Sequence, residues 1–409
     1  MPTLLSINNY YYRRGGAEVV FLEQNRLVEE VGWKVGPFCM NHEKNLPTPW
    51  SRFFVDEIEF GNAYSVAGKL AMAGKIAYSR EAQRKVSAMA QELLPDVAHA
   101  HNVYHHISPS IFKSLKGMGI PTVLTLHDLK IACPAYKMLT HDGVCERCKG
   151  GHLWNVVSNR CLKGSLAVSA VVFVESTLHR LIGAYSKHVD RFVVPSRFYI
   201  EKFVEWGWPR ERFVHVPNFV DAQAIRPAGS PGDAFVFVGR LAPEKGLRTF
   251  IEAAILAGVR AQIVGTGPEE DELRAMVAER GAGRIEFLGY KSGEALFDTI
   301  RKARALVLPS EWYENAPMSV LEAYALERPV IGARIGGIPE LIREGETGAV
   351  FESGNPAALA EVLRDFAARS EHEIETMGRA GREWASRDFT AERYRQRILD
   401  VYAGLGIAV

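Results

Sequence analysis

Short apolar segments alternate with amphipathic, helix-like segments along nearly the whole chain, and this alternation constrains the fold most strongly. The apolar segments are continuous rather than alternately apolar and polar, which is typical of parallel strands covered by helices on both faces. They lie at 3–7, 97–100, 122–126 and 191–195, and again at 235–239, 261–265, 285–289, 305–309 and 329–333. The pattern predicts an α/β protein with parallel sheets.

A linker divides these segments into two sets. The chain has 409 residues, whereas single cores stop growing at roughly 250–300 residues. The stretch 217–232 is rich in proline and glycine, as linkers are. We expect two doubly wound, Rossmann-like domains, 1–217 and 218–389, facing across a deep cleft, with a helix at about 390–409 packing back on the first. Ligands of such sheets bind at the carboxyl ends of the strands.

Composition narrows the partners. The formal net charge is +1, so no overall field attracts nucleic acid or a membrane. The longest apolar run, 165–174, is far shorter than a membrane span of ~20 residues; we interpret it as a buried helix, with shallow membrane contact left open. Arg80, Arg84 and Lys85 could meet a membrane surface or form a solvated helix face. No signal peptide is recognisable, so we expect a cytoplasmic protein, with peripheral membrane contact possible.

Two cations follow the strand at 235–239. Arg240 and Lys245 lie in the loop that leads to the next helix, with Gly239 and Gly246 beside them. Either cation alone would pass for ordinary surface charge. Together at a strand end, with glycines that let the backbone approach closely, they indicate a phosphate site. After the following strand, Gly265 and Gly267 lack the spacing of a P-loop or a dinucleotide fingerprint, and we assign Gly267, with Tyr290 nearby, to a pocket for a base.

The stretch "WYENAPMSVLEA" places two carboxylates, Glu314 and Glu322, around a helix start. Pro317 suits the first helical position, with Asn315 or Ala316 as the cap. Met318 and Ser319 would then present free backbone N–H groups. Such amides bind phosphate, and the flanking carboxylates accept hydrogen bonds from sugar hydroxyls.

The first half offers a second helix start. Arg13, Arg14, Gly15 and Gly16 precede a helix near 17–31, and they are either a tight turn with a solvated charge pair or an anion site at a helix N-terminus. His127 and Asp128 end the strand at 122–126. A single histidine is more often structural than functional. His101 and Asn102 follow another strand and could touch an acceptor.

These motifs resemble those of the retaining glycosyltransferases of family 4, which have the two-domain GT-B fold. The segments "GGAE", "VPNFVD", "VGRLAPEKGL", "VGTGPEEDELR" and the two glutamates ahead of "GGIPEL" carry the resemblance. It implies that Arg240 and Lys245 bind the diphosphate of a nucleotide sugar, and that Gly15 and Gly16 face that diphosphate. It also implies that Glu314 and neighbouring amides hold the donor sugar, that Glu322 binds the ribose, and that His127 lies near the reacting carbon. The sequence reads "ENAPM" where the family commonly has "EGFGL".

The implied reaction retains the anomeric configuration. In the family the leaving phosphate takes the proton of the acceptor, and we expect no catalytic metal. A UDP-sugar is the first expectation for the donor and GDP-mannose the second; the acceptor is expected to be a glycan or lipid-linked glycan. A nucleotide-sugar epimerase of the same architecture and a non-catalytic nucleotide-sugar-binding protein are the alternatives.

Four of the five cysteines fall within one stretch: Cys133, Cys145, Cys148 and Cys161. The Cys-x2-Cys pair is typical of a zinc knuckle, and the outer two could complete a site of four thiolates. Disulfides are disfavoured in a reducing cytosol. The stretch resembles a cysteine-rich insert found in a subset of the family. We expect a structural zinc, with free thiols as the alternative.

Overall fold

The computed structural model describes residues 1–57, 74–104, 106–227 and 229–409. The first half builds a sheet of parallel strands in the order β2-β1-β3-β4-β7-β8. In register, Leu5 lies opposite Gly36 on one side and Ala98 on the other. The strands are β1 (Thr3–Ile7), β2 (Lys34–Phe38), β3 (Val97–Ala100), β4 (Thr122–Thr125), β7 (Arg191–Val194) and β8 (Phe213–His215).

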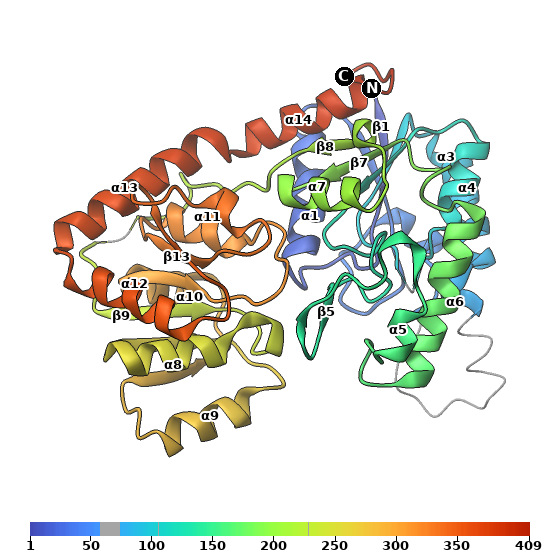
Figure 1. Cartoon of the computed structure of the whole chain (residues 1–409). Helices are drawn as coiled ribbons and strands as arrows, with labels where there is room; N and C mark the ends of the chain where they lie inside the picture. The colour runs from blue at the N-terminus through green and yellow to red at the C-terminus, as the bar shows by residue number, and fades with distance from the viewer. Residues whose placement is uncertain (58–73, 105, 228) are drawn as a thin grey trace.

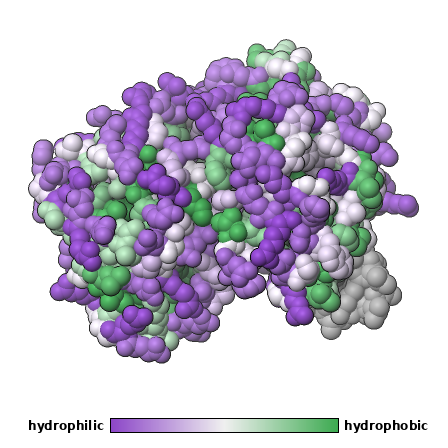
Figure 2. Space-filling model, viewed as in Figure 1, coloured by the Kyte–Doolittle hydropathy of each residue, from purple (hydrophilic) through white to green (hydrophobic). Residues whose placement is uncertain are grey.

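The second half builds another parallel sheet, in the order β11-β10-β9-β12-β13-β14. This is the strand order of dinucleotide-binding folds. The strands are β9 (Ala234–Val238), β10 (Arg260–Val264), β11 (Ile285–Gly289), β12 (Ala305–Leu308), β13 (Val330–Ala333) and β14 (Gly348–Phe351). The predicted α/β class with two parallel sheets is therefore confirmed, and the space-filling view is hollowed along its lower edge between the two halves (Figure 2).

Helices connect and cover the strands (Figure 1). The first half contains α1 (Gly16–Glu29), α3 (Arg80–Leu93), α4 (Ser110–Gly117), α5 (Asn155–Ser158), α6 (Leu166–Ile182) and α7 (Arg197–Glu205). The second half contains α8 (Leu247–Ala257), α9 (Glu270–Glu279), α10 (Gly293–Arg301), α11 (Met318–Ala325), α12 (Pro356–Ala368), α13 (Glu371–Asp388) and α14 (Ala391–Ala403). The short 3-10 turns are η1 (Pro49–Phe53), η2 (Lys149–Gly151), η3 (Arg210–Arg212), η4 (Pro243–Lys245) and η5 (Ile338–Leu341).

Helix α14 returns from the second half to the first, where it lies along α1 (Figure 1). Its Tyr394 hydroxyl donates to Gln24 Oε1 at 2.8 Å, and its Tyr402 hydroxyl lies 2.8 Å from His99 Nδ1. Both tyrosines are buried in one apolar cluster with Leu4 of β1. Buried hydrogen bonds of this kind fix a helix in one orientation, because an unpaired partner would lose its solvation.

The strand order of each sheet determines which loops lie at the expected ligand-binding edge. In the first sheet the order reverses beside β1, and in the second it reverses between β9 and β12. Ligands of open parallel sheets bind at the carboxyl ends of strands at such reversals. The loops after β9 and β12 carry Lys245 and Glu314, and the loop after β1 leads to Gly16.

The expectation for the apolar run 165–174 was only partly right. It forms the start of α6, but Leu166 and Val174 are more than half exposed, whereas Glu175 and His179 are buried. The helix turns polar side chains inward because Lys130 Nζ pairs with Glu175 at 2.8 Å and Ala77 O accepts from His179 at 2.7 Å. Within the described ranges, no helix combines the length and apolar character needed to cross a bilayer.

Candidate active site

Lys245 and Glu314 meet at the strand-order reversal of the second sheet. Lys245 Nζ lies 2.6 Å from Glu314 Oε1, and the Ser310 hydroxyl donates to the same oxygen at 2.9 Å. Glu314 is buried and Lys245 partly exposed. Gly246 holds this turn in the left-handed region, at φ +66°, and a Cβ there would stand 1.9 Å from Pro309 O. Only glycine therefore fits between the loops after β9 and β12.

One further cation, Lys137, lies near this pair beside the Trp312 ring. Lys245 Nζ lies 5.3 Å and Lys137 Nζ 6.0 Å from the ring centroid of Trp312. Lys137, from the first half, also pairs with Glu244 at 2.8 Å. Arg240 is exposed. The sequence interpretation missed Lys137 and Ser310, because neither lies in a motif.

The glycines after β10 allow their loop to pack closely against the loop after β9. A Cβ at Gly265 would stand 1.9 Å from Gly239 O, and a Cβ at Gly267 would stand 2.2 Å from Leu241 O. Gly267 therefore lets this loop lie against the loop of Arg240. Tyr290, which was assigned to the same base pocket, is 75% exposed beyond β11.

Helix α11 begins one residue later than predicted. Pro317 is its N-cap and Met318 its first residue, so neither Asn315 nor Ala316 caps it. Pro317 has an extended backbone, at φ −63° and ψ +123°, and no side chain caps the helix. The N–H groups of Met318 and Ser319 remain in the first turn, where helical bonds leave amides unpaired.

Asn315 instead joins the two halves of the protein. Its Nδ2 donates to Leu126 O at 3.0 Å and His127 O at 3.3 Å, and its Oδ1 accepts from the Ser196 hydroxyl at 2.8 Å. Gly337 N donates to Glu314 O at 2.8 Å and supports the same loop from the other side. The loop ahead of α11 is thus held against the loop that carries His127.

The two predicted helix starts lie close together. A Cβ at Gly16, the first residue of α1, would stand 3.9 Å from Met318 Cγ of α11. The positive ends of two helix dipoles, one from each half, therefore approach the same place. The arginines ahead of α1 have partners in their own half: Arg13 pairs with Glu23, and the Arg14 guanidinium lies 4.2 Å from the centroid of the Tyr10 ring.

Glu322 lies one turn along α11 from this helix start. Its carboxyl is largely shielded, and burial raises its pKa above the ordinary value. No ion pair of Glu322 occurs in the part of the chain that the structure describes. A shielded carboxylate of this kind gains from hydroxyl donors, because burial reduces its hydration and no cation among the described residues pairs with it.

His127 belongs to a row of histidines. Its Nε2 lies 2.9 Å from His101 Nδ1, and the rings of His99, His101 and His127 stack in succession at centroid distances of 5.0 and 5.2 Å. Burial lowers the pKa of His127 to about 4 and that of His99 to about 3, so both are neutral near pH 7. Burial also raises the pKa of Asp128 to about 6. The row runs from Tyr402 of α14 to the loop that Asn315 holds.

The four clustered cysteines line one small cavity of about 10 Å³: Cys133, Cys145, Cys148 and Cys161. All are free thiols. The β5 (Leu139–Thr140) and β6 (Gly143–Val144) hairpin precedes the Cys-x2-Cys pair. Across the described ranges, no three histidine, cysteine, aspartate or glutamate side chains are arranged to hold a metal ion. The thiols converge without reaching ligand spacing.

Comparison with known proteins assigns both halves. The family model "Glycosyltransferase Family 4" matches residues 14–224, more than half of the chain, and "Glycosyl transferases group 1" matches residues 223–384. An uncharacterized glycosyltransferase of Methanocaldococcus jannaschii is 31% identical over 267 residues, which are 65% of this chain and 74% of that protein. The lipopolysaccharide core biosynthesis glycosyltransferase LpsE of Rhizobium meliloti is 28% identical over 194 residues, 45% of this chain and 56% of that protein.

A solved structure shares the whole fold. The Anabaena protein HepE, crystallised with UDP and glucose, superposes with a TM-score of 0.68 over 99% of this chain and 100% of its own, at 17% identity. With the paired parallel sheets and the family matches, the conclusion is direct: the chain belongs to glycosyltransferase family 4 and is a glycosyltransferase of the GT-B fold.

Proposed function

We propose that the protein transfers a sugar from a nucleotide diphosphate sugar, a UDP-sugar first, to a glycan or lipid-linked glycan, with retention of configuration. One observation carries this proposal: the N-termini of α1 and α11 approach each other from the two halves, at Gly16 and Met318. Unpaired amides and two positive dipole ends favour a diphosphate there. UDP is preferred because HepE, of the same fold, was crystallised with UDP and glucose.

The second half, 218–389, would bind the donor, and the first half, 1–217, the acceptor. Arg240 and Lys245 would neutralise the diphosphate, together with the first-turn amides of Met318 and Ser319. Lys245 exchanges Glu314 for phosphate on binding, and this releases the Glu314 carboxylate to accept from hydroxyls of the donor sugar. Glu322 accepts hydrogen bonds from the ribose hydroxyls. Gly15 and Gly16 have no side chain, so their backbone can approach the diphosphate closely. Gly239 and Gly267 shape the loops around it.

The reaction breaks the bond between the anomeric carbon and the leaving phosphate oxygen. The acceptor oxygen forms the new bond on the same face, and its proton passes to the leaving phosphate. Arg240 and Lys245 stabilise the negative charge that grows on this phosphate. His127, neutral at pH 7, hydrogen bonds near the reacting carbon without taking the proton.

The glycan acceptor rests on the printed functions of relatives. LpsE is described as a lipopolysaccharide core biosynthesis enzyme, and two related chains carry the description putative colanic acid biosynthesis glycosyltransferase. Both descriptions concern polysaccharides built from sugar units. Peripheral contact with a membrane would bring the enzyme to a lipid-linked acceptor.

We also propose that the cysteine insert binds a structural zinc. The spacing of the cysteines and their shared cavity support this, and coordination would draw the thiols closer. Elemental analysis of protein purified without chelators should find about one zinc per chain, and Cys145→Ser with Cys148→Ser should abolish it. Wild-type protein that contains no zinc, and whose melting temperature does not change when zinc is added, would exclude the site.

The transfer itself is tested with a donor panel. Calorimetry should show UDP binding more tightly than GDP, and incubation of UDP-sugars with oligosaccharide acceptors should yield a product whose anomeric configuration, read by NMR, matches the donor. Inverted product, or an epimerised donor without transfer, would contradict the proposal.

A further inference from the structure

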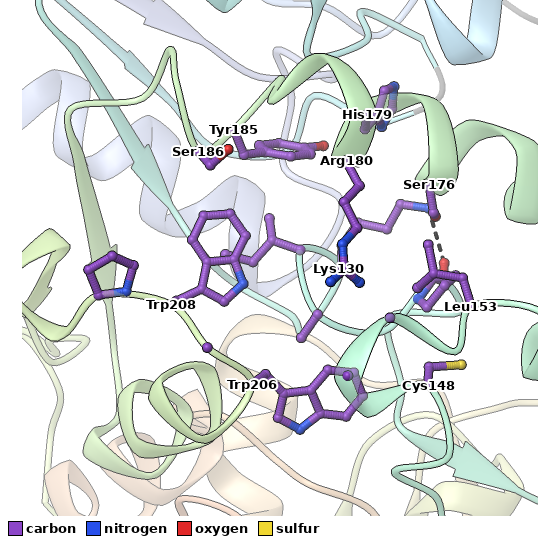
Figure 3. A pocket seen from close by; sticks show the side chains of 17 residues that line it. Lys130, Cys148, Leu153, Ser176, His179, Arg180, Tyr185, Ser186, Trp206 and Trp208 are labelled. Atoms are coloured by element: carbon purple, nitrogen blue, oxygen red, sulfur yellow. Dashed lines mark hydrogen bonds between the residues drawn. The ribbon is translucent and has the colours of Figure 1, made fainter.

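A second hollow lies in the first half, beside the loop that continues from Asp128. Its volume is about 260 Å³, and it is enclosed by residues 130–134, the turn at 148–153, the C-terminal part of α6 and residues 206–209 (Figure 3). Pockets for drug-sized ligands measure ~300–1,000 Å³, so this one suits a single small unit. None of the proposed donor-binding residues lines it.

Two indoles form one side of the cavity. Trp206 and Trp208 are half-buried and flank Gly207, whose φ of +89° belongs to the left-handed region. The Trp208 ring is packed edge-on to Phe192, with centroids 5.4 Å apart, which fixes its orientation. Rigid aromatic rings of this kind provide apolar area at low entropic cost, and they stack well on the C–H faces of sugar rings.

The charges around the cavity do not cancel. Lys130 is neutralised, because its Nζ lies 2.8 Å from Glu175 Oε2 and also donates to Pro134 O at 3.0 Å. Arg180 extends from α6 into the same space (Figure 3), and it makes no ion pair with any residue that the structure describes. Gly151, at φ +95°, gives the guanidinium room, since a Cβ there would overlap it.

The Tyr185 ring completes the cavity wall. Tyr185 is 7% exposed and lines the hollow, and its hydroxyl has no hydrogen-bond partner among the described residues. Because the hydroxyl is enclosed in the cavity wall, Tyr185 presents its ring and not its hydroxyl to a ligand.

We propose that this cavity binds an acidic sugar unit of the acceptor, one that bears a carboxylate or phosphate. The inference rests on the proposed glycan acceptor and adds its chemical class. Arg180 would pair with the anionic group in the two-bond geometry that guanidinium favours, and the tryptophans would stack on the ring. The site would hold a unit remote from the reacting one, because the wall at Lys130 continues directly into the loop of His127 and Asp128.

Tryptophan fluorescence of the full chain tests the site. We would titrate glucuronic acid oligosaccharides and glucose 6-phosphate, with neutral glucose oligosaccharides in parallel. The acidic probes should change the emission and the neutral ones should not. Arg180→Gln should weaken acidic binding about 10- to 100-fold, whereas Lys187→Gln, an exposed cation outside the cavity, should leave it unchanged. Tyr185→Phe removes only a hydroxyl enclosed in the wall and should leave acidic binding unchanged.

Equal binding of neutral and acidic probes, or unaltered affinity in Arg180→Gln, would overturn the inference. So would a complete absence of binding. Calorimetry with UDP on the same samples separates this outcome from failure of the proposed function, since UDP binding does not involve Arg180. A folded protein that binds UDP but none of the acidic probes refutes only the cavity assignment.

Discussion

Lys245 lies between a carboxylate and a ring, 2.6 Å from Glu314 and over Trp312. We predict that Lys245→Ala lowers kcat by about 10²–10³-fold while the fold is kept, because a charge aimed at the leaving phosphate acts mainly in the transition state. Arg248→Ala removes a cation from the next helix that is half exposed and paired with Glu272, and it should retain near-normal turnover. Circular dichroism would verify folding. Turnover of Lys245→Ala close to wild type would contradict the assigned role.

The histidine row predicts a stability that depends on pH. The pKa values of His99, His101 and His127 in the folded protein lie below the ordinary 6.5. Above pH 6.5 both folded and unfolded chains leave them neutral. Below it the unfolded chain takes up protons first, so the free energy of unfolding falls by about 1.4 kcal/mol per pH unit for each such histidine. Asp128, whose pKa is raised to about 6, has the opposite effect: between about pH 6 and pH 3.8 it raises the free energy of unfolding as the pH falls. This offsets the contribution of only one of the three histidines.

Urea unfolding at pH 7 and pH 5 measures this difference. His127→Gln should show a smaller loss on acidification than the wild type, because one of the three groups is removed. His372→Gln, at an exposed position on α13, should match the wild type. An identical loss in His127→Gln would mean that this imidazole can be protonated within the fold.

At the residue level, the sequence predicts proximity where residues follow strands of one sheet. Lys245 and Glu314 are remote in sequence, but both follow strands of one parallel sheet, so the shared edge brings them together. The cap role of Asn315 was wrong, because its amide instead bonds with backbone oxygens and the Ser196 hydroxyl of the other half, which no motif encodes. The neighbour of Gly267 is Leu241 O, which the sequence could not reveal, because a glycine does not show whether ligand or backbone approaches it.

At the level of elements, the predicted strands of the two parallel sheets are the interior ones together with β11, and the strands omitted from these sheets are β2, β8 and β14, all at sheet edges. Interior strands are buried on both faces and read as continuous apolar runs. The segment of β2 contains Gly36 and Pro37, and β8 spans only Phe213–His215. Edge strands are short and broken in this way because one side lacks a partner, so the signal that reveals the interior strands is absent from them.

The helix α8 offers a matched test of loop geometry. Gly246 and Gly258 border it at φ +66° and +70°, but a Cβ at Gly258 meets nothing within 4 Å, whereas one at Gly246 would collide with Pro309 O. Gly258→Ala should cost about 1–2 kcal/mol of unfolding free energy, the strain of the left-handed backbone alone. Gly246→Ala should cost more and weaken UDP binding at least tenfold, because the turn that carries Lys245 must shift. Chemical denaturation and calorimetry would measure both, and equal effects of the two variants would show that the collision is relieved without moving Lys245.

At the scale of the molecule, the proposed transfer site draws on both halves and therefore depends on the contacts that hold them together. Lys137 pairs with Glu244, Tyr199 donates its hydroxyl to Tyr313 O at 2.9 Å, and Glu340 accepts from the backbone of Arg197 at 2.8 Å. Each of these contacts joins a residue of the first half to one of the second. Sequence patterns predicted two sheets with their carboxyl ends in a common cleft, but not these contacts, because contacts between independently folded units depend on their relative placement.

Asn315 is the sharpest probe of this placement, since its amide forms all its bonds with Leu126, His127 and Ser196 of the other half. Asn315→Ala should raise the donor KM about tenfold, because the helix starts of α1 and α11 would no longer be preorganised. Small-angle scattering should show a larger radius of gyration. Asn355→Ala is the control: it removes the N-cap of α12, at a cost of about 1 kcal/mol, without touching the first half. Asn355→Ala should lose about as much stability as Asn315→Ala, but its donor KM and its radius of gyration should equal those of the wild type. If both variants raise KM alike, general destabilisation rather than domain placement would govern donor binding.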